Sequence, residues 1–370
     1  MYMKKGKILI FHPALAPYRV DFFNLLSDKF ETKFYFSLDN LPDQKFDQDE
    51  LHKKIRFKFY LLSGFDIFNK TFRFGIFNIL LKEKPEKVLC SEYSQITFTV
   101  LLFKMLFNSS LKVYTLSDDS IDSSIKRKGI RKFVRNIASK KIDGIIFPSQ
   151  QVGKWFNENV NSKVKVFELP IVHDNTKFRE NLKQVLSISE DYIQKFNFAD
   201  KTIFLFVGRL VKLKNVEFLI RSFSKCRQTN VKLIIVGDGE EFESLRQLIY
   251  DLTLTDSCFM TGRFEGDDLI AWYNIAQCLV LPSYLERYGA VVNEALLAGC
   301  KVLCSNYAGA SVLINKNNGH TFNPRDEFQL TELINKISID TEPVSLPLQL
   351  KPDLMPFTFN EKIDILLSQL

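Results

Sequence analysis

The chain has 370 residues, of which 46% are hydrophobic and 25% are charged, and its formal net charge is +7. The length favours two domains of roughly 150–200 residues over a single core, and the composition is that of a soluble globular protein. No apolar run reaches the ~18–20 residues of a membrane span. The six cysteines lack zinc-ligand and C-x-x-C spacing, so we predict reduced core cysteines in a cytosolic protein.

Short apolar runs alternate with longer amphipathic ones along the first half of the chain. The runs that predict strands are "KILIFH", "TKFYFSL", "RFKFYLL", "KVLCSE", "KVYTLSD" and "DGIIFPS", and helical patterns such as "ITFTVLLFKMLF" lie between several of them. Buried strands that alternate with helices are typical of a parallel, doubly wound α/β sheet.

A second series of strands begins at "KTIFLFVGR" and continues through "VKLIIVGDG", "CFMTGR", "CLVLPS" and "KVLCSN". We therefore predict two Rossmann-like domains, over residues 1–172 and 173–355, with a helix in 356–370 that packs back on the first domain. Ligands bind at the carboxyl ends of the strands in such sheets, so the loops there are the candidate sites.

Basic residues are concentrated in the first half of the chain. Residues 1–170 carry 29 Lys and Arg against 18 Asp and Glu, whereas the remainder carries 21 against 25. Within the segment "KRKGIRKFVRNIASKKI", Ile130, Phe133, Val134 and Ile137 follow helical spacing, and basic residues occupy the other faces. Such a helix can lie on an anionic membrane. A core helix with a solvated basic face is the alternative.

The first strand of the second series leads into a possible phosphate site. Gly208 and Arg209 follow the strand, and Lys214 stands just before the next predicted helix, near Asn215. A glycine lets the backbone approach a ligand, Arg offers a two-pronged donor to phosphate oxygens, and Lys offers a point charge. Together they predict a diphosphate site.

Two further glycine turns follow the next strands. "VGDGEEF" lacks the third glycine of a dinucleotide-binding motif, so we interpret it as a turn before a helix that starts at Glu240. At Gly262 and Arg263, backbone groups could hydrogen-bond a nucleotide base, with an ordinary turn as the alternative.

The stretch "LPSYLERYGAVVNEALLAGC" places two glutamates eight residues apart. Glu286 lies in a loop, while Glu294 borders the apolar face of a helix that we expect from Gly289 onward. A carboxylate there needs hydrogen-bond donors, and ribose hydroxyls are suitable ones. The amides of Tyr288 and Gly289 open the helix and can face an anion.

These residues carry a resemblance to a known family. Residues 200–330 resemble the retaining GT-B glycosyltransferases of family 4, in which two Rossmann-like domains face each other across a cleft. The matching segments, in the family's order, are "GRLVKLKNVEFLI", "VGDGEEFESL", the E-x7-E segment "ERYGAVVNEALLAG" and "NNGHTFNPRD".

The resemblance implies a function for the donor side. Arg209 and Lys214 would hold the diphosphate of a UDP- or GDP-linked sugar, with Gly208 permitting its close approach. Glu286 and the two helix-opening amides would bind the sugar, and Glu294 the ribose. Transfer would retain the anomeric configuration, without a metal, a cofactor or a protein nucleophile. The acceptor would be a saccharide or lipid-linked saccharide in surface polysaccharide or lipopolysaccharide synthesis, at the cytoplasmic face of the membrane.

The first domain departs from the family pattern. The loop "HPALAPYR" has no glycine, and "TLSDDS" stands where many members have a histidine. Asp118 and His12 are therefore candidates for orienting the acceptor. The alternative for Asp118 is an N-cap of the next helix.

Two other classes of function compete with glycosyl transfer. One is a sugar-nucleotide epimerase or phosphorylase of similar architecture, although the extra acid/base residues or the cofactor lysine that these need are not evident. The other is a non-catalytic membrane- or nucleic-acid-binding protein, which would leave both glutamates unexplained because carboxylates repel phosphates. We therefore expect a nucleotide sugar as ligand and no nucleic acid.

Overall fold

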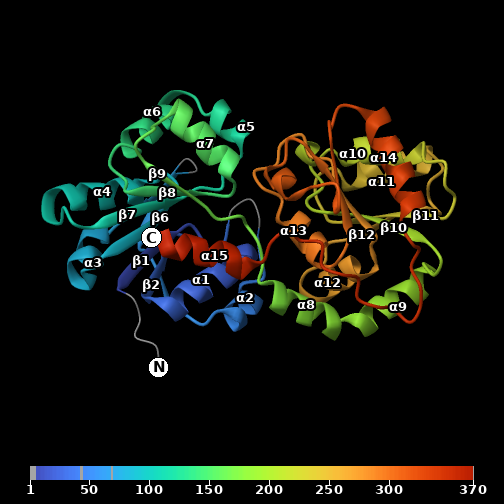
Figure 1. The fold of residues 1–370 in the computed structure, drawn as a ribbon, viewed down its shortest axis with the longest axis horizontal. Helices are drawn as coiled ribbons and strands as arrows, with labels where there is room; N and C mark the ends of the chain where they lie inside the picture. The colour runs from blue at the N-terminus through green and yellow to red at the C-terminus, as the bar shows by residue number, and fades with distance from the viewer. Residues whose placement is uncertain (1–5, 42–44, 68–69, 370) are drawn as a thin grey trace. The chain divides into compact units, whose positions relative to one another are not determined.

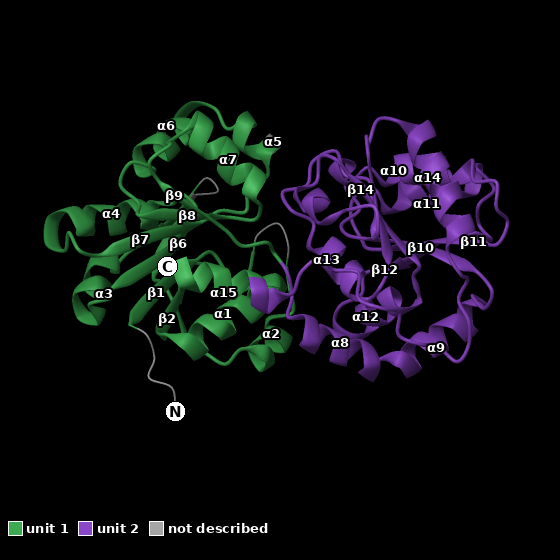
Figure 2. Cartoon of the chain, viewed as in Figure 1, with its two compact units in different colours: residues 1–171, 362–370 green, residues 172–361 purple. Residues whose placement is uncertain are grey.

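The computed structural model describes residues 6–41, 45–67 and 70–369, and it divides the chain into two compact units (Figures 1 and 2). Unit 1 comprises Met1–Ile171 and Lys362–Leu370, and unit 2 comprises Val172–Glu361. Each unit has its own parallel β-sheet with helical crossovers. The structure thus confirms the predicted fold of two Rossmann-like α/β units.

The sheet of unit 1 has seven strands in the order β3-β2-β1-β6-β7-β8-β9, all paired in parallel. The strands are β1 (Lys7–His12), β2 (Glu31–Phe36), β3 (Phe59–Leu61), β6 (Lys87–Ser91), β7 (Lys112–Leu116), β8 (Gly144–Phe147) and β9 (Lys165–Glu168). All six predicted strands are present. The sequence analysis missed β9 and the separate hairpin of β4 (Gly64–Ile67) and β5 (Lys70–Arg73). Both strands of the hairpin are short, and β4 is exposed along its whole length, so neither shows a buried apolar run.

The helices of unit 1 connect these parallel strands. They are α1 (Pro17–Lys29), α2 (Gln48–Lys54), α3 (Ile76–Glu83), α4 (Gln95–Phe107), α5 (Ile121–Lys126), α6 (Gly129–Ala138) and α7 (Gln150–Asn159). Ser94, Ser120 and Ser149 cap α4, α5 and α7 by accepting a hydrogen bond from a backbone N–H of the first turn. The cap of α5 is therefore Ser120, and the alternative cap role for Asp118 is wrong.

The sheet of unit 2 has six parallel strands in the order β12-β11-β10-β13-β14-β15. The strands are β10 (Thr202–Val207), β11 (Val231–Val236), β12 (Cys258–Gly262), β13 (Cys278–Leu281), β14 (Lys301–Ser305) and β15 (Gly319–Phe322). Every residue of β10 and β13 is buried, as expected of central strands covered on both faces. The order reverses between β10 and β13, so this pair marks the topological switch of the sheet.

The helices of unit 2 are α8 (Asn175–Gln184), α9 (Leu186–Phe196), α10 (Val216–Ser224), α11 (Phe242–Asp251), α12 (Gly266–Ile275), α13 (Ala290–Leu297) and α14 (Glu327–Asp340), with the short 3₁₀ helices η1 (Lys212–Lys214) and η2 (Gly309–Leu313). The helix expected from Glu240 begins later, at Phe242, because a turn at Gly239 precedes it: the N–H of Phe242 bonds the Gly239 carbonyl at 3.0 Å. All six cysteines are free, and five of them are buried.

The last helix, α15 (Phe359–Gln369), begins in unit 2 and continues into unit 1. Ile363 and Leu366 are buried, and Lys362 forms an ion pair of 2.8 Å with Glu168 of β9. Two buried apolar side chains and this ion pair attach the end of the chain to unit 1.

Candidate functional site

The carboxyl ends of β10 and β13 form the topological switch point of unit 2, where ligands of open α/β sheets bind. The segment after β10 carries Gly208, Arg209 and η1, and the segment after β13 is the loop that leads to α13. A hydrogen bond of 2.9 Å from the N–H of Tyr284 to the carbonyl of Leu213 joins the two segments. The fold therefore brings the predicted phosphate residues beside the E-x7-E loop.

The central contact of this site is an ion pair between the ammonium of Lys214 and the carboxylate of Glu286. Only 19% of the lysine side chain and 16% of the glutamate side chain are exposed. The loop that carries Glu286 is fixed from the other side, because the N–H of Gly309 donates to the Glu286 carbonyl at 3.2 Å. A positive group on η1 and a negative group on the loop after β13 thus lie together, and the first can bind a phosphate while the second accepts hydrogen bonds from hydroxyl groups.

Gly289 allows the loop to turn into α13. Its φ is +99°, a conformation that residues with a side chain rarely adopt. A Cβ atom at this position would lie 2.8 Å from Leu281 Cδ2 and 3.2 Å from Glu286 Cγ. The glycine therefore keeps the Glu286 side chain close to the start of the helix.

Glu294 obtains its hydrogen-bond donors from the protein. The hydroxyl of Tyr273 donates to Glu294 Oε2 at 2.6 Å, and His173 Nε2 lies 3.3 Å from Oε1. Burial by itself raises the pKa of this carboxyl, but the hydrogen bonds from His173 and Tyr273 and the His173 charge bring the pKa of Glu294 below its ordinary value. Burial and the Glu294 charge raise the pKa of Tyr273 well above its ordinary value. The carboxylate is therefore ionised and held in place, with 18% of its side chain exposed.

Sequence reasoning missed both partners of Glu294. His173 follows the last strand of unit 1 by sequence, and Tyr273 lies in α12, so both are distant from Glu294 along the chain. The sequence indicated only that Glu294, beside an apolar helix face, needs hydrogen-bond donors; it did not indicate which residues supply them.

The remaining strand ends of unit 2 bear the other predicted residues. Arg209 is exposed, and Arg263 pairs with Glu265. Gly262 has a φ of +81° with open space around its Cβ position, and its carbonyl accepts the N–H of Gly237 at 2.8 Å. These three residues lie at the carboxyl edge of the unit 2 sheet.

The two glycines of "VGDGEEF" serve packing. A Cβ on Gly237 would lie 1.9 Å from the carbonyl oxygen of Gly208, and one on Gly239 would lie 2.4 Å from that of Leu210. The loops after β10 and β11 therefore approach each other backbone to backbone, and this holds Gly208 in place.

In unit 1 the two acceptor candidates belong to one polar group at the carboxyl edge. Asp118, after β7, pairs with Arg19 of α1, a side chain that is only 2% exposed. His12, at the end of β1, is buried, and its Nδ1 donates to the carbonyl of Ala14 at 2.8 Å. Burial, together with the Arg19 charge, lowers the pKa of His12 to about 4, whereas the Asp118 charge raises it. His12 is therefore neutral at pH 7, and both charges lie near it.

Next to this group, a second polar cluster surrounds Arg127. Its guanidinium bonds both carboxylate oxygens of Asp119, at 2.8 and 2.6 Å, and lies 3.5 Å from Glu92. Asp119 is buried, so the aspartate beside the predicted Asp118 has a structural partner of its own.

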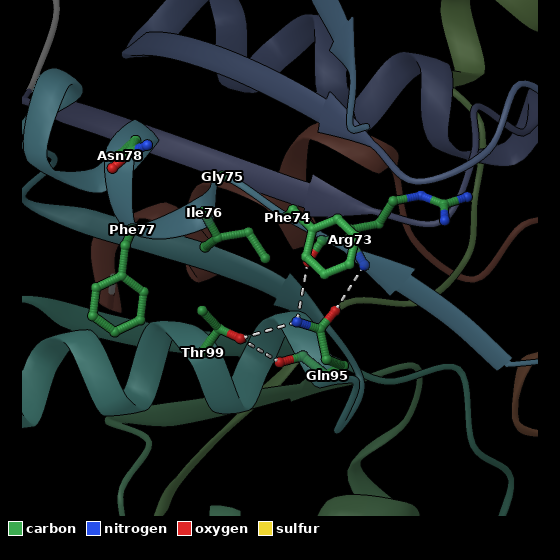
Figure 3. Close-up of a pocket in the computed structure, with 8 residues that line it drawn as sticks. All are labelled: Arg73, Phe74, Gly75, Ile76, Phe77, Asn78, Gln95 and Thr99. Carbon is green, nitrogen blue, oxygen red and sulfur yellow. Dashed lines mark hydrogen bonds between the residues drawn. The ribbon is translucent and has the colours of Figure 1, made fainter. Parts of the chain in front are cut away.

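A recess of about 270 Å³ lies in unit 1 beside the start of α3 (Figure 3). Its polar groups bond one another, since Gln95 bonds the backbone of Arg73 and the hydroxyl of Thr99. The guanidinium of Arg73 points away from the recess, toward Ser37 and Asp66. The recess therefore offers aromatic and amide surface without a free charge.

Neither a cluster of metal ligands nor a helix suited to crossing a membrane is present among the residues that the structure describes. Within residues 6–41, 45–67 and 70–369, no group of three or more His, Cys, Asp or Glu side chains could hold a metal ion. In the same ranges no helix has the length and the apolar character that crossing a membrane requires.

Comparison with solved structures defines the class of fold. The Anabaena protein HepE, crystallised in complex with UDP, superposes with a TM-score of 0.75 over 99% of this chain and 100% of its own, at 16% identity. The same protein has been crystallised with UDP-glucose. At this identity the likeness establishes the fold alone, which is the GT-B fold with two Rossmann-like domains.

Comparison of sequences finds a family model and several relatives that match parts of the chain. Residues 188–348 match the family model described as glycosyl transferases group 1, a segment that contains β10 to β15 and the Lys214–Glu286 pair. An uncharacterized glycosyltransferase of Methanocaldococcus jannaschii is 27% identical over 86% of this chain and 85% of its own. The lipopolysaccharide 1,2-N-acetylglucosaminetransferase of Salmonella typhimurium is 30% identical over 213 residues. The chain spans about half of the Salmonella enzyme (54%) and 35% of a second M. jannaschii glycosyltransferase.

Proposed function

We propose that the protein is a retaining glycosyltransferase of family 4, which moves a sugar from a nucleoside-diphosphate donor to a saccharide or lipid-linked saccharide acceptor. The observation that carries the proposal is the Lys214–Glu286 pair at the topological switch of unit 2, inside the segment that matches the group 1 glycosyl transferases. A phosphate group and a polyhydroxylated ring would each find a complementary group there.

The donor residues have separate roles in the proposal. Arg209 and Lys214 bind the diphosphate, and the Gly208 backbone lies against it. When the donor phosphate binds Lys214, the Glu286 carboxylate leaves the lysine and binds the sugar hydroxyls. The ion pair therefore holds both side chains close to their binding positions before the donor arrives. Glu294, held by Tyr273 and His173, accepts hydrogen bonds from the ribose.

The remaining strand-end groups complete the donor site in the same proposal. The amides of Tyr288 and Gly289 face the sugar and phosphate at the start of α13. The backbone at Gly262, with Arg263 beside it, meets the nucleotide base.

The chemical step is governed by the charge on the leaving group. The bond between the anomeric carbon and the donor phosphate oxygen breaks, the acceptor oxygen bonds the same face of that carbon, and the acceptor proton passes to the leaving phosphate. Arg209 and Lys214 stabilise the negative charge that develops on the nucleoside diphosphate, which is the largest catalytic task in such a reaction. On this mechanism we propose that transfer needs neither a metal nor a protein nucleophile.

The acceptor side of the proposal lies in unit 1. Asp118 orients the acceptor hydroxyl. Neutral His12 fixes the loop after β1 beside it through its hydrogen bond to the Ala14 carbonyl. The relatives point to lipopolysaccharide or capsular polysaccharide as the pathway, since one is a lipopolysaccharide enzyme of Salmonella and another, from Staphylococcus aureus, is named for capsular polysaccharide biosynthesis.

We also propose a cytoplasmic protein that binds the inner face of an anionic membrane through unit 1. The support is α6, whose apolar side chains Ile130, Phe133 and Ile137 are 80%, 66% and 43% exposed. This exposure argues against the alternative of a core-packing helix.

The donor site can be tested by nucleotide binding. UDP is the first nucleotide to try because HepE was crystallised with it, and GDP and ADP serve for comparison. We expect Lys214→Met to weaken binding at least about tenfold, the loss of one charge-assisted contact. Lys212→Met, on the same 3₁₀ helix, is the matched control and should change binding less than about twofold. Equal effects of the two variants would contradict the assignment, and stabilisation by single-stranded DNA alone would end the glycosyltransferase proposal.

A further inference from the structure

A recess of about 300 Å³ lies in unit 1 among α5, α6 and α7, which Figure 1 shows grouped at one end of the unit. Its lining includes Ser124, Arg127, Lys132, Arg135 and Trp155. Three of these side chains are cations, and no carboxylate lines the recess among the side chains that the structure describes. The site therefore has the charge of an anion-binding pocket.

Arg135 is the unusual member of this group. It is only 3% exposed, its Nη1 donates to the Ser124 carbonyl at 3.0 Å, and its Nε–H has no acceptor among the described residues. The guanidinium lies 5.4 Å from the centre of the Trp155 ring. A buried guanidinium without a bonded carboxylate is costly, so an anion in the recess would supply what it lacks.

The neighbouring cations are not equivalent. Arg127 is already bound to Asp119 and lies near Glu92. Lys132 is exposed and makes no ion pair within the part of the chain that the structure describes. An incoming anion would therefore contact Arg135 from inside the recess and Lys132 from its mouth.

The surroundings of the recess indicate the kind of anion. Ile125, which also lines the recess, is 57% exposed, and Ile130, Phe133 and Ile137 form an exposed apolar flank along α6. Helical spacing places Lys132 and Arg135 on the other flank. Residues 123–142 contain eight Lys and Arg and no Asp or Glu. Exposed apolar side chains among basic ones are the signature of a helix that lies in an anionic lipid interface.

We propose that this recess binds the phosphate group of an anionic glycerophospholipid, with Arg135 and Lys132 as its ligands. Ile130, Phe133 and Ile137 then enter the boundary between head groups and acyl chains on the opposite flank of α6. The inference rests on the proposed membrane contact of unit 1 and is independent of glycosyl transfer. Unit 1 would then recognise the lipid phosphate in the recess, in addition to the general attraction of its basic residues to a negatively charged surface.

Flotation with lipid vesicles tests the proposal. One set of vesicles contains phosphatidylcholine with phosphatidylglycerol, and the other is matched in surface charge with oleate in place of phosphatidylglycerol. We expect the wild-type protein to bind the phosphate-bearing vesicles at least about fivefold more tightly, because a tetrahedral phosphate offers oxygens to Arg135 and Lys132 at once, whereas the planar carboxylate of oleate offers its two oxygens to a single fork. Lys132→Gln should remove this preference. Lys141→Gln deletes the same charge outside the recess and should keep the preference. Both positions are exposed, so neither change should prevent folding.

The other outcomes separate the parts of the proposal. Equal binding of the two vesicles, with equal effects of Lys132→Gln and Lys141→Gln, overturns the phosphate site and leaves a diffuse charge contact. Absence of binding to either vesicle, or full binding by Phe133→Ser, overturns the membrane contact as well. If glycerol 3-phosphate binds in solution while Lys132→Gln leaves vesicle binding unchanged, the recess takes a soluble phosphate and the lipid assignment is wrong. Nucleotide binding, measured on the same samples, reports on the donor site separately.

Discussion

At the residue scale, the two glutamates of the E-x7-E segment differ in how they are held. Glu286 pairs with the ammonium of Lys214, on a neighbouring loop, whereas Glu294 is fixed by the hydroxyl of Tyr273 and by His173. A single ion pair is exchanged easily when a ligand offers a phosphate to the lysine. A carboxylate that accepts a hydrogen bond from a buried hydroxyl and lies against an imidazole keeps its orientation. We therefore assign the movable role to Glu286 and the fixed role to Glu294.

Replacing Glu286 by Gln tests the movable role. The amide keeps the size of the side chain but loses the charge that holds the sugar hydroxyls, so we expect kcat to fall about 10²-fold, the loss typical of a misplaced substrate. The midpoint of unfolding should also fall, because Lys214 is only 19% exposed and keeps its charge without a carboxylate partner. Steady-state kinetics and thermal melting check both statements. Unfolding of the variant, with full activity in the folded fraction, would make Glu286 a structural residue.

The second prediction concerns His12, whose pKa is lowered to about 4 by burial. The unfolded chain takes up a proton near the ordinary pKa of 6.5, while folded unit 1 does not until about pH 4. Stability of unit 1 should therefore fall as the pH drops between these values, by about 2 kcal/mol from pH 7 to pH 5. His12→Asn retains a donor for the Ala14 carbonyl but does not titrate, so it should lose this part of the pH dependence.

The measurement can be confined to unit 1. Of the two tryptophans, Trp155 lies in unit 1 and Trp272 in unit 2. Urea unfolding followed by fluorescence in a Trp272→Phe background therefore reports on unit 1. If wild-type and His12→Asn proteins have parallel pH profiles in this background, the buried histidine does not have the lowered pKa.

At the scale of elements, the donor loops depend on glycines that allow close backbone contact. Gly237 and Gly239 let the loops after β10 and β11 meet, and Gly289 lets α13 start against Glu286. The E-x7-E segment thus consists of the end of the loop that follows β13 and the first two turns of α13. Its two acids reach different parts of the site because the first precedes the helix and the second lies in its second turn.

Gly289→Ala tests this element. The new methyl group would approach Leu281 and Glu286 in a backbone conformation that alanine disfavours, so we expect a loss of about 3 kcal/mol in the stability of unit 2 and weaker nucleotide binding. Gly266→Ala is the matched control, since it also has a positive φ, +58°, at a helix start but open space around it. It should cost about 1–2 kcal/mol from the backbone alone. Fluorescence of Trp272 in a Trp155→Phe background follows the unfolding, and equal losses would show that the contacts at Gly289 are unimportant.

At the scale of the whole molecule, the chain leaves unit 1, builds unit 2 and returns through α15. The end of the chain therefore stabilises the unit in which the chain began. The exposed apolar and basic face of α6 belongs to the same unit, so unit 1 carries both the proposed membrane contact and the proposed acceptor site.

Ile363→Ala should lower the stability of unit 1 by about 2–5 kcal/mol, because it leaves a cavity under a side chain that is fully buried. Ile365, in the same helix, is 54% exposed, and its change to alanine should cost about 0.5 kcal/mol or less. Urea unfolding with Trp155 as the probe measures both. Similar small losses would show that α15 is not part of the core of unit 1.

The sequence by itself determined the architecture and the order of the motifs. Continuous apolar runs such as "IFLFV" predict buried parallel strands because only strands covered on both faces tolerate them. The strand-end positions of Arg209, Lys214 and Glu286 followed from the same pattern. Only the tertiary structure decided which of these side chains meet: Lys214 with Glu286, Glu294 with Tyr273 and His173, Asp118 with Arg19. Periodicity fixes which face of an element is buried, whereas contacts between residues far apart in sequence depend on the strand order, and the strand order is set by packing of the whole domain.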